Sequence, residues 1–102
     1  MIIIQGQAHF GEGELDRIRR DIVDMVDASR AEEGCLYYAL AIDALEPNLL
    51  HVSGRWREET ALRRHYGSGH IDAVLKAVEP GRIGILDVKG YDAGNARTLL
   101  GK

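Results

Sequence analysis

Residues 35–56 read CLYYALAIDALEPNLLHVSGRW, and this stretch decides the fold of the chain. Its first eight residues, 35–42, are all apolar, and a run of that length between turn signals predicts a strand covered on both faces. Residues 43–48 contain Pro47 and predict a turn. The alternation over residues 49–57 predicts the partner strand, so the whole stretch is expected to form a β-hairpin.

The segments on the N-terminal side of the hairpin predict one strand and one helix. Residues 1–10 alternate and are rich in isoleucine, as in a strand, and Gly11 ends the pattern. Residues 14–31 place apolar side chains at steps of three and four residues, which predicts one amphipathic helix. Gly34 follows at the place where a left-handed glycine commonly ends a helix.

The segments on the C-terminal side predict a second helical region and a last strand. Residues 58–66 and 70–78 form two short helical stretches around a glycine break, and the Pro80-Gly81 pair ends the second one. Residues 82–91 alternate again, as in a strand.

The order strand, helix, strand, strand, helix, strand predicts an α+β, ferredoxin-like βαββαβ fold with a four-stranded antiparallel sheet and helices on one face. At 102 residues the chain is too short for a second core, so residues 1–102 are expected to form a single domain. The sheet face away from the helices is rich in apolar side chains, and such a face is unlikely to remain exposed to water. A second copy of the chain can cover it, so we expect a homodimer through this face. The apolar residues placed there are Ile3, Cys35, Tyr37, Ala39, Ala41, Leu49, Ile83 and Ile85.

Composition excludes several classes of partner. Thirteen Lys and Arg against 16 Asp and Glu give a formal net charge of −3, so no nucleic acid is expected. No apolar run approaches the roughly 20 residues that span a bilayer, and the first residues lack the pattern of a secretory signal, so we expect no membrane. The single cysteine, Cys35, is typical of a reducing compartment, and the expected location is cytoplasmic.

The sequence also lacks the common cofactor motifs. It contains neither the glycine-rich loop of nucleotide-binding proteins nor that of dinucleotide-binding domains. Its four histidines show no metal-ligand spacing, so the expected metal is none. Cys35 lies inside an apolar strand, where a thiol is usually an inert small hydrophobe.

Residues 56–70 contain the largest concentration of side chains that could bind a ligand or transfer a proton. Trp56 ends a predicted strand, and His65 and Tyr66 end the helix that follows it. His70 comes after the glycine break, so two imidazoles and two large rings are expected at the mouth of an apolar hollow between sheet and helices. Imidazole exchanges protons near neutral pH, which makes His70 and His65 candidates for general base or for hydrogen-bond donor to an anion. The alternative is structural: a His70 ring bonded to backbone, a solvated His65, and Trp56 and Tyr66 as plain core.

Three groups of residues resemble the antibiotic biosynthesis monooxygenase (ABM) family, over about residues 2–88. They are Glu33-Gly34-Cys35-Leu36-Tyr37-Tyr38, the Glu46-Pro47-Asn48 turn, and Trp56 followed by Glu58, Ala61, Leu62, His65, Ser68 and His70. The resemblance implies a dimeric α+β barrel of ferredoxin-like subunits. Its members include enzymes that oxidise aromatic polyketides or quinols with dioxygen and without metal or flavin, haem-degrading enzymes and an isomerase-like enzyme.

The resemblance implies roles for Trp56 and His70. Trp56 matches the tryptophan that lines the pocket of cofactor-free members, and His70 matches the histidine of a Ser-Pro-His step that reads Ser68-Gly69-His70 in this chain. We therefore expect a monooxygenase that uses no cofactor and acts on a small phenolic or quinol-type aromatic substrate. In this interpretation His70 removes the substrate proton, Tyr38 or His65 hydrogen-bonds the resulting anion, and Trp56 and Tyr66 form the pocket walls.

Two other functions remain open on the same fold. One is a non-catalytic dimer that binds a small ligand or acts in a stress response. It is favoured because Val52 and Leu62 replace the asparagine and the aromatic residue of polyketide-oxidising members. The other is an isomerase that moves protons with the same histidines and without oxygen.

Overall fold

The structure is a computed structural model that describes residues 1–78 and 83–101. Its elements follow the predicted order, with each of the two helical regions divided in two. They are β1 (Ile2–Phe10), α1 (Glu14–Arg17), α2 (Arg19–Arg30), β2 (Cys35–Ile42), β3 (Leu49–Trp56), α3 (Glu59–Tyr66), α4 (Gly69–Ala77) and β4 (Ile83–Asp92).

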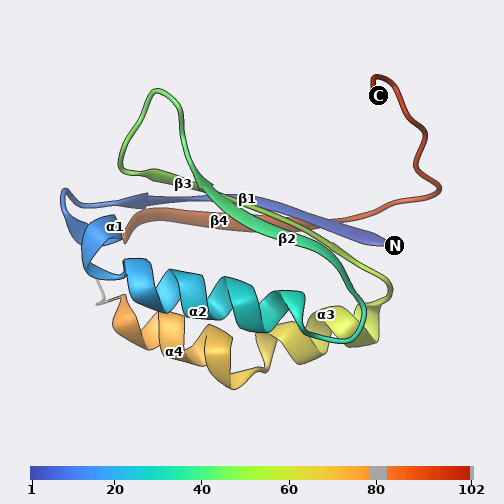
Figure 1. Ribbon diagram of the computed structural model, residues 1–102, viewed down its shortest axis with the longest axis horizontal. Coiled ribbons are helices and arrows are strands. Elements are labelled where there is room, and N and C mark those ends of the chain that lie inside the picture. Colours follow the sequence, from blue (N-terminus) through green and yellow to red (C-terminus); the bar gives the residue numbers. More distant parts are fainter. Residues whose placement is uncertain (79–82, 102) are drawn as a thin grey trace.

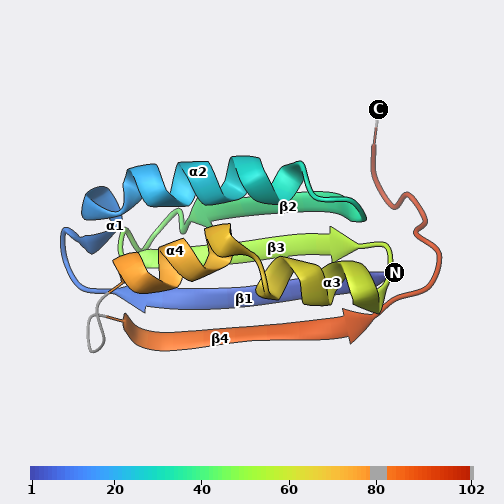
Figure 2. The same cartoon turned by 90° about the horizontal axis from the view of Figure 1, so that it is seen from below.

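The four strands form one antiparallel sheet in the order β2-β3-β1-β4, and the helices lie together on one of its faces (Figure 1). This arrangement confirms the predicted α+β, ferredoxin-like fold and the hairpin of β2 and β3. Helix α2 runs along β2, and α3 and α4 lie over the centre of the sheet (Figure 2). No helix of the described residues lies over the edge strand β4 (Figure 2). No helix among the described residues is long and apolar enough to cross a membrane.

The core lies where the two central strands meet the helices. Every second side chain of β1 and β3 points toward the helices, and antiparallel register puts Ile2 opposite Trp56 and Ile4 opposite Gly54. The buried cluster between the two layers consists of Ile4, Met25, Tyr38, Trp56 and Ala61. Its position under α3 brings the end of β3 into contact with the helical residues of the site.

The structure corrects two details of the sequence prediction. The helix expected over residues 14–31 is broken at Ile18, whose backbone leaves helical geometry (φ −102°, ψ 9°) while its side chain is only 1% exposed. A register irregularity between Cys35 and Tyr37 turns Cys35 toward the core, the reverse of its predicted side, and leaves Leu36 48% exposed. The predicted helix end at residues 80–81 lies outside the described residues.

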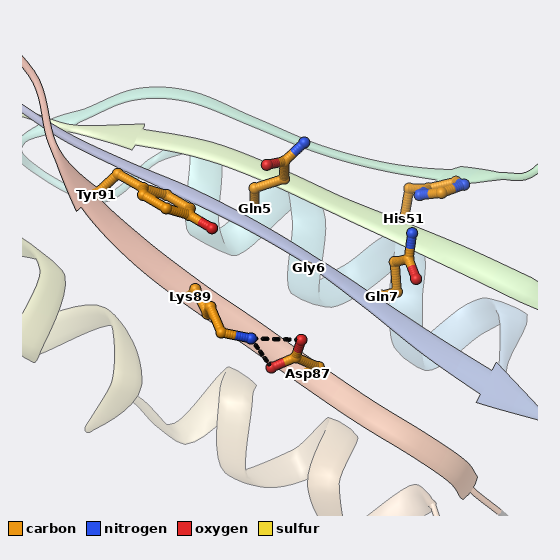
Figure 3. A pocket seen from close by; sticks show the side chains of 7 residues that line it. All are labelled: Gln5, Gly6, Gln7, His51, Asp87, Lys89 and Tyr91. Atoms are coloured by element: carbon orange, nitrogen blue, oxygen red, sulfur yellow. Dashed lines mark hydrogen bonds and ion pairs between the residues drawn. The ribbon is translucent and has the colours of Figure 1, made fainter.

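The outer face of the sheet carries a polar strip beside its apolar residues. A cavity of about 280 Å³ lies over β1, β3 and β4, and Figure 3 shows its side chains standing on the side of the sheet that faces away from the helices. Lys89 forms an ion pair with Asp87 at 2.6 Å along β4. The remaining lining residues are Gln5, Gly6, Gln7, His51 and Tyr91.

Candidate functional site

The turn between α2 and β2 holds the first residue of the site, Glu32. Gly34 takes the left-handed conformation predicted for it, with φ +86°. A Cβ at this position would lie 2.5 Å from the Cβ of Ala61 on α3, so only glycine lets the turn approach this helix. The Gly34 carbonyl accepts a hydrogen bond from the backbone N–H of Arg57 at 2.8 Å, which ties the turn to the end of β3.

The junction of α3 and α4 places the two histidines. His65 lies in the last turn of α3 and His70 in the first turn of α4. Between them, the Ser68 hydroxyl donates to the His65 carbonyl at 2.6 Å and accepts from the Ile71 N–H at 3.4 Å, so Ser68 caps α4. This cap orients the start of α4 so that both imidazoles face the Glu32 turn.

One carboxylate holds both imidazoles. His65 Nδ1 lies 3.2 Å from both oxygens of Glu32, and His70 Nε2 forms a short hydrogen bond with Glu32 Oε1. The Glu32 side chain is 15% exposed and that of His70 is 24% exposed, whereas His65 is fully buried. The structure therefore brings the two predicted histidines together through a residue that the sequence analysis did not single out.

The buried face of His65 lies in an aromatic cluster. Its ring centroid is 4.5 Å from that of Trp56 and 5.0 Å from that of Tyr38. Tyr66 meets the His65 ring edge-on at 4.9 Å but is itself 49% exposed. Trp56 is 0% exposed and Tyr38 is 4% exposed, so these two rings belong to the core as well as to the site.

Two ring nitrogens in this cluster are buried and lack a hydrogen-bond partner among the described residues: Trp56 Nε1 and His65 Nε2. Leaving such a group unpaired costs about 1–3 kcal/mol each. Proteins rarely keep buried polar atoms unpaired without a reason, and an absent ligand or water is a common one. The two nitrogens therefore mark a polar point inside an otherwise apolar cluster.

Burial also sets the protonation of the cluster. It lowers the pKa of His65 below 6.5, an effect that the neighbouring Glu32 carboxylate opposes and His70 reinforces. Burial raises the pKa of Tyr38 far above its usual value, so Tyr38 is a neutral phenol at physiological pH.

The open part of the site lies outside the aromatic cluster. A cavity of about 290 Å³ is lined by Glu32, His70, Glu33, Arg64 and Ser68. Neither Trp56 nor His65 lines this cavity, and both are fully buried. In place of the open hollow expected from the sequence, the structure has rings in contact, with His70 at the outer edge and His65 at the inner end.

Glu32, His65 and His70 each offer a ligand atom within 4.8 Å of the others, and two imidazoles with one carboxylate suit a divalent metal. A metal-bound histidine almost always donates its other ring N–H to an acceptor. Within the described part of the chain His65 Nε2 has no such acceptor. Hydrogen bonds to the Glu32 carboxylate account for the three-residue cluster without an ion.

The protein is a ferredoxin-like domain, because its antiparallel sheet carries the helices on one face. Its candidate site is the histidine cluster between the sheet and the helices. The family model described as antibiotic biosynthesis monooxygenase matches residues 1–77, and the chain belongs to this family. The resemblance seen in the sequence is thereby confirmed.

Solved structures share the fold at low sequence identity. A Deinococcus radiodurans protein, provisionally named an antibiotic biosynthesis monooxygenase, is 24% identical with a TM-score of 0.90, covering 99% of this chain and 100% of its own. A Nitrosomonas europaea protein with a similarly provisional name is 12% identical, with a TM-score of 0.83 and coverage of 91% and 98%. PA3566 from Pseudomonas aeruginosa is 23% identical, with a TM-score of 0.75 and coverage of 92% and 94%. No curated protein sequence matches the chain.

Proposed function

We propose that this protein is a monooxygenase that oxidises a small phenolic or quinol-type aromatic with dioxygen, using no metal or flavin. Family membership supports the reaction class. The observation that carries the substrate class is a pair of buried nitrogens in an aromatic cluster, Trp56 Nε1 and His65 Nε2, for which the described residues supply no hydrogen-bond partner. Aromatic walls with a few polar atoms are typical of sites that bind flat, hydroxyl-bearing rings.

In the proposed reaction a histidine of the cluster removes the substrate hydroxyl proton, which leaves an electron-rich aromatic anion. This anion reduces dioxygen directly: one oxygen atom stays on the substrate, the other leaves as water, and the substrate supplies all four electrons. The pocket stabilises the anion with hydrogen bonds and keeps bulk water from the peroxy intermediate. Tyr38 is suited to donate such a bond because its raised pKa keeps the phenol protonated. Trp56 and Tyr66 would form the walls.

We further propose that the protein works as a homodimer through the outer sheet face. Four large apolar or aromatic side chains there and along the strand edges are about half exposed in the single chain: Leu36, Tyr37, Ile85 and Tyr91. A second copy laid sheet against sheet would cover such a face with its own equivalent. The lone cysteine fits a reducing cytoplasm.

A second candidate function is the binding of a small ligand without turnover, which is favoured because Val52 and Leu62 replace the asparagine and the aromatic residue of polyketide-oxidising members. Trp56 and His65 are fully buried, so a ligand would reach them only after neighbouring residues move. The hydrogen-bonding atoms and aromatic rings of the cluster are sufficient for such a protein, because binding requires neither proton transfer nor dioxygen. An isomerase would use the same histidines without oxygen.

Dioxygen uptake separates these functions. The purified protein is assayed with a panel of hydroquinones and anthrones in buffer containing EDTA, with and without air. If the protein is a monooxygenase, substrate oxidation should continue in EDTA and stop when air is removed. Dioxygen uptake should fall strongly in His65→Gln. The control variant His9→Gln should retain its uptake, because His9 lies at the end of β1 away from Trp56. Turnover without oxygen would identify an isomerase, and ligand binding with no turnover would identify a binding protein.

A further inference from the structure

The hydrogen bonds around Glu32 determine which nitrogen of His65 carries a proton. An ionised carboxylate only accepts hydrogen bonds, so the His65 Nδ1 atom at 3.2 Å from both of its oxygens must carry the hydrogen. Burial favours the neutral ring, and a neutral imidazole has one N–H only. His65 Nε2 is therefore a bare lone pair, buried and without a partner among the described residues.

The second unpartnered atom is complementary to the first. Trp56 Nε1 is a pure donor, whereas His65 Nε2 in this tautomer is an acceptor. The two rings lie 4.5 Å apart between centroids at an interplanar angle of 39°. A hydroxyl group has the chemistry that both atoms need, because its O–H donates to a bare histidine nitrogen while its oxygen accepts from a tryptophan N–H.

We propose that His65 is the catalytic base of the site, that it takes the proton of a substrate hydroxyl on Nε2, and that Glu32 is the positioning residue that keeps this nitrogen free. The proposal rests on the proposed function, and it assigns the base to His65 where the sequence favoured His70. In the step, the substrate O–H bond breaks and the Nε2–H bond forms, so the electron pair stays on the substrate oxygen. The new anion accepts hydrogen bonds from Trp56 Nε1 and from the protonated His65.

Glu32 contributes to this step in two ways. It fixes the ring in the Nδ1–H tautomer, and its negative charge opposes the effect of burial on the imidazolium that forms. A buried carboxylate bonded to Nδ1–H orients the catalytic histidine of hydrolytic triads by the same logic. His70 has an indirect role in this proposal. Its Nε2 donates a hydrogen bond to the Glu32 carboxylate at the edge of the 290 Å³ cavity, and so helps to hold that carboxylate in place.

The ionisable groups that face His65 come from three elements and the turn before β2. They are Glu32 on the turn, Tyr38 on β2, Tyr66 on α3 and His70 on α4. Tyr38 is neutral because burial raises its pKa, which leaves Glu32 as the group that opposes burial in setting the pKa of His65. Loss of the Glu32 charge should therefore lower the pKa of His65.

The first test reads the tautomer directly and needs no substrate. Two-bond ¹⁵N–¹H correlation spectra of the ¹⁵N-labelled protein at pH 7.5 distinguish a protonated ring nitrogen from a bare one. We expect His65 in the Nδ1–H form in the wild type and in His70→Gln, and a mixture of tautomers in Glu32→Gln. A wild-type His65 protonated on Nε2 would overturn the proposal.

The second test uses kinetics with the best substrate of the oxygen-uptake panel. Loss of a general base costs 10²- to 10⁴-fold, so kcat should fall by about 100-fold or more in His65→Gln and by about tenfold in Glu32→Gln. In Glu32→Gln the acid limb of the pH profile should also move to lower pH, a shift that a merely structural role for Glu32 would not produce. A larger loss in His70→Gln than in His65→Gln, or an unmoved acid limb, would contradict the assignment. If no substrate is oxidised, the proposed function fails while the spectra still decide the tautomer.

Discussion

Gly34 determines where the Glu32 carboxylate lies, because it closes the turn between α2 and β2 against α3. Its φ of +86° and the 2.5 Å approach of its missing Cβ to Ala61 are two separate requirements for glycine. The sequence predicted the first from the position of Gly34 after a helix. The second depends on α3, which is distant in sequence, and could not be predicted.

We predict that Gly34→Ala destabilises the fold by about 3 kcal/mol, of which left-handed backbone strain contributes only about 1 kcal/mol. Gly13→Ala is the matched control, since Gly13 has φ +81° but no atom within 4 Å of the Cβ position. Urea denaturation of both variants gives the difference. Equal losses in the two variants would mean that the contact with Ala61 is unimportant.

The protonation of His65 gives a second prediction at the residue scale. Because burial lowers the folded-state pKa of His65, the unfolded chain binds more protons, and the free energy of unfolding should fall as the pH drops below 6.5. Denaturation curves at pH 7.5 and 5.5 measure this loss, which should be smaller in His65→Gln. An identical loss in the variant would place the acid sensitivity elsewhere.

At the scale of elements, hydrophobic periodicity was sufficient for the strands and helices but not for the details that build the site. The eight apolar residues of β2 predicted a strand, yet the irregularity between Cys35 and Tyr37 turned Cys35 from its predicted outer side toward the core. Trp56 and both histidines stood out by their chemistry. Glu32 did not, since a glutamate after a helix usually faces solvent, and only the fold shows that it meets His65 and His70.

Among the helices of the described residues, α4 is the one least secured by burial. None of its residues is classed as buried, whereas α2 buries Met25 and Ser29. Local opening follows such differences, so we predict that amide hydrogens of α4 exchange on the order of tenfold faster than those in the middle of α2. Hydrogen exchange followed by NMR measures both helices in one sample. Equal protection would indicate that α4 opens only when the whole domain unfolds, so that local opening of α4 could not admit a ligand to the buried cluster.

At the scale of the whole molecule, the proposed assembly is a homodimer through the outer sheet face. A homodimer predicts twice the 11.3 kDa of the chain in light scattering. Ile3 lies on this face in the central strand β1, and Ile3→Asp would place a charge in the proposed interface. The variant should sediment as a monomer, whereas Val23→Asp, exposed on α2, should remain a dimer. A monomeric wild type would contradict the proposed assembly.

The central claim is that the buried cluster of Trp56, His65 and Tyr38 receives the ligand, whether or not oxidation follows. Trp56 is the only tryptophan of the sequence and is fully buried, so its fluorescence reports this cluster directly. Titration with a hydroquinone should change the emission saturably, with one site per chain, while free N-acetyltryptophanamide shows only a linear decrease. A protein that binds or oxidises the hydroquinone without any saturable change in Trp56 emission would show that the ligand site lies elsewhere.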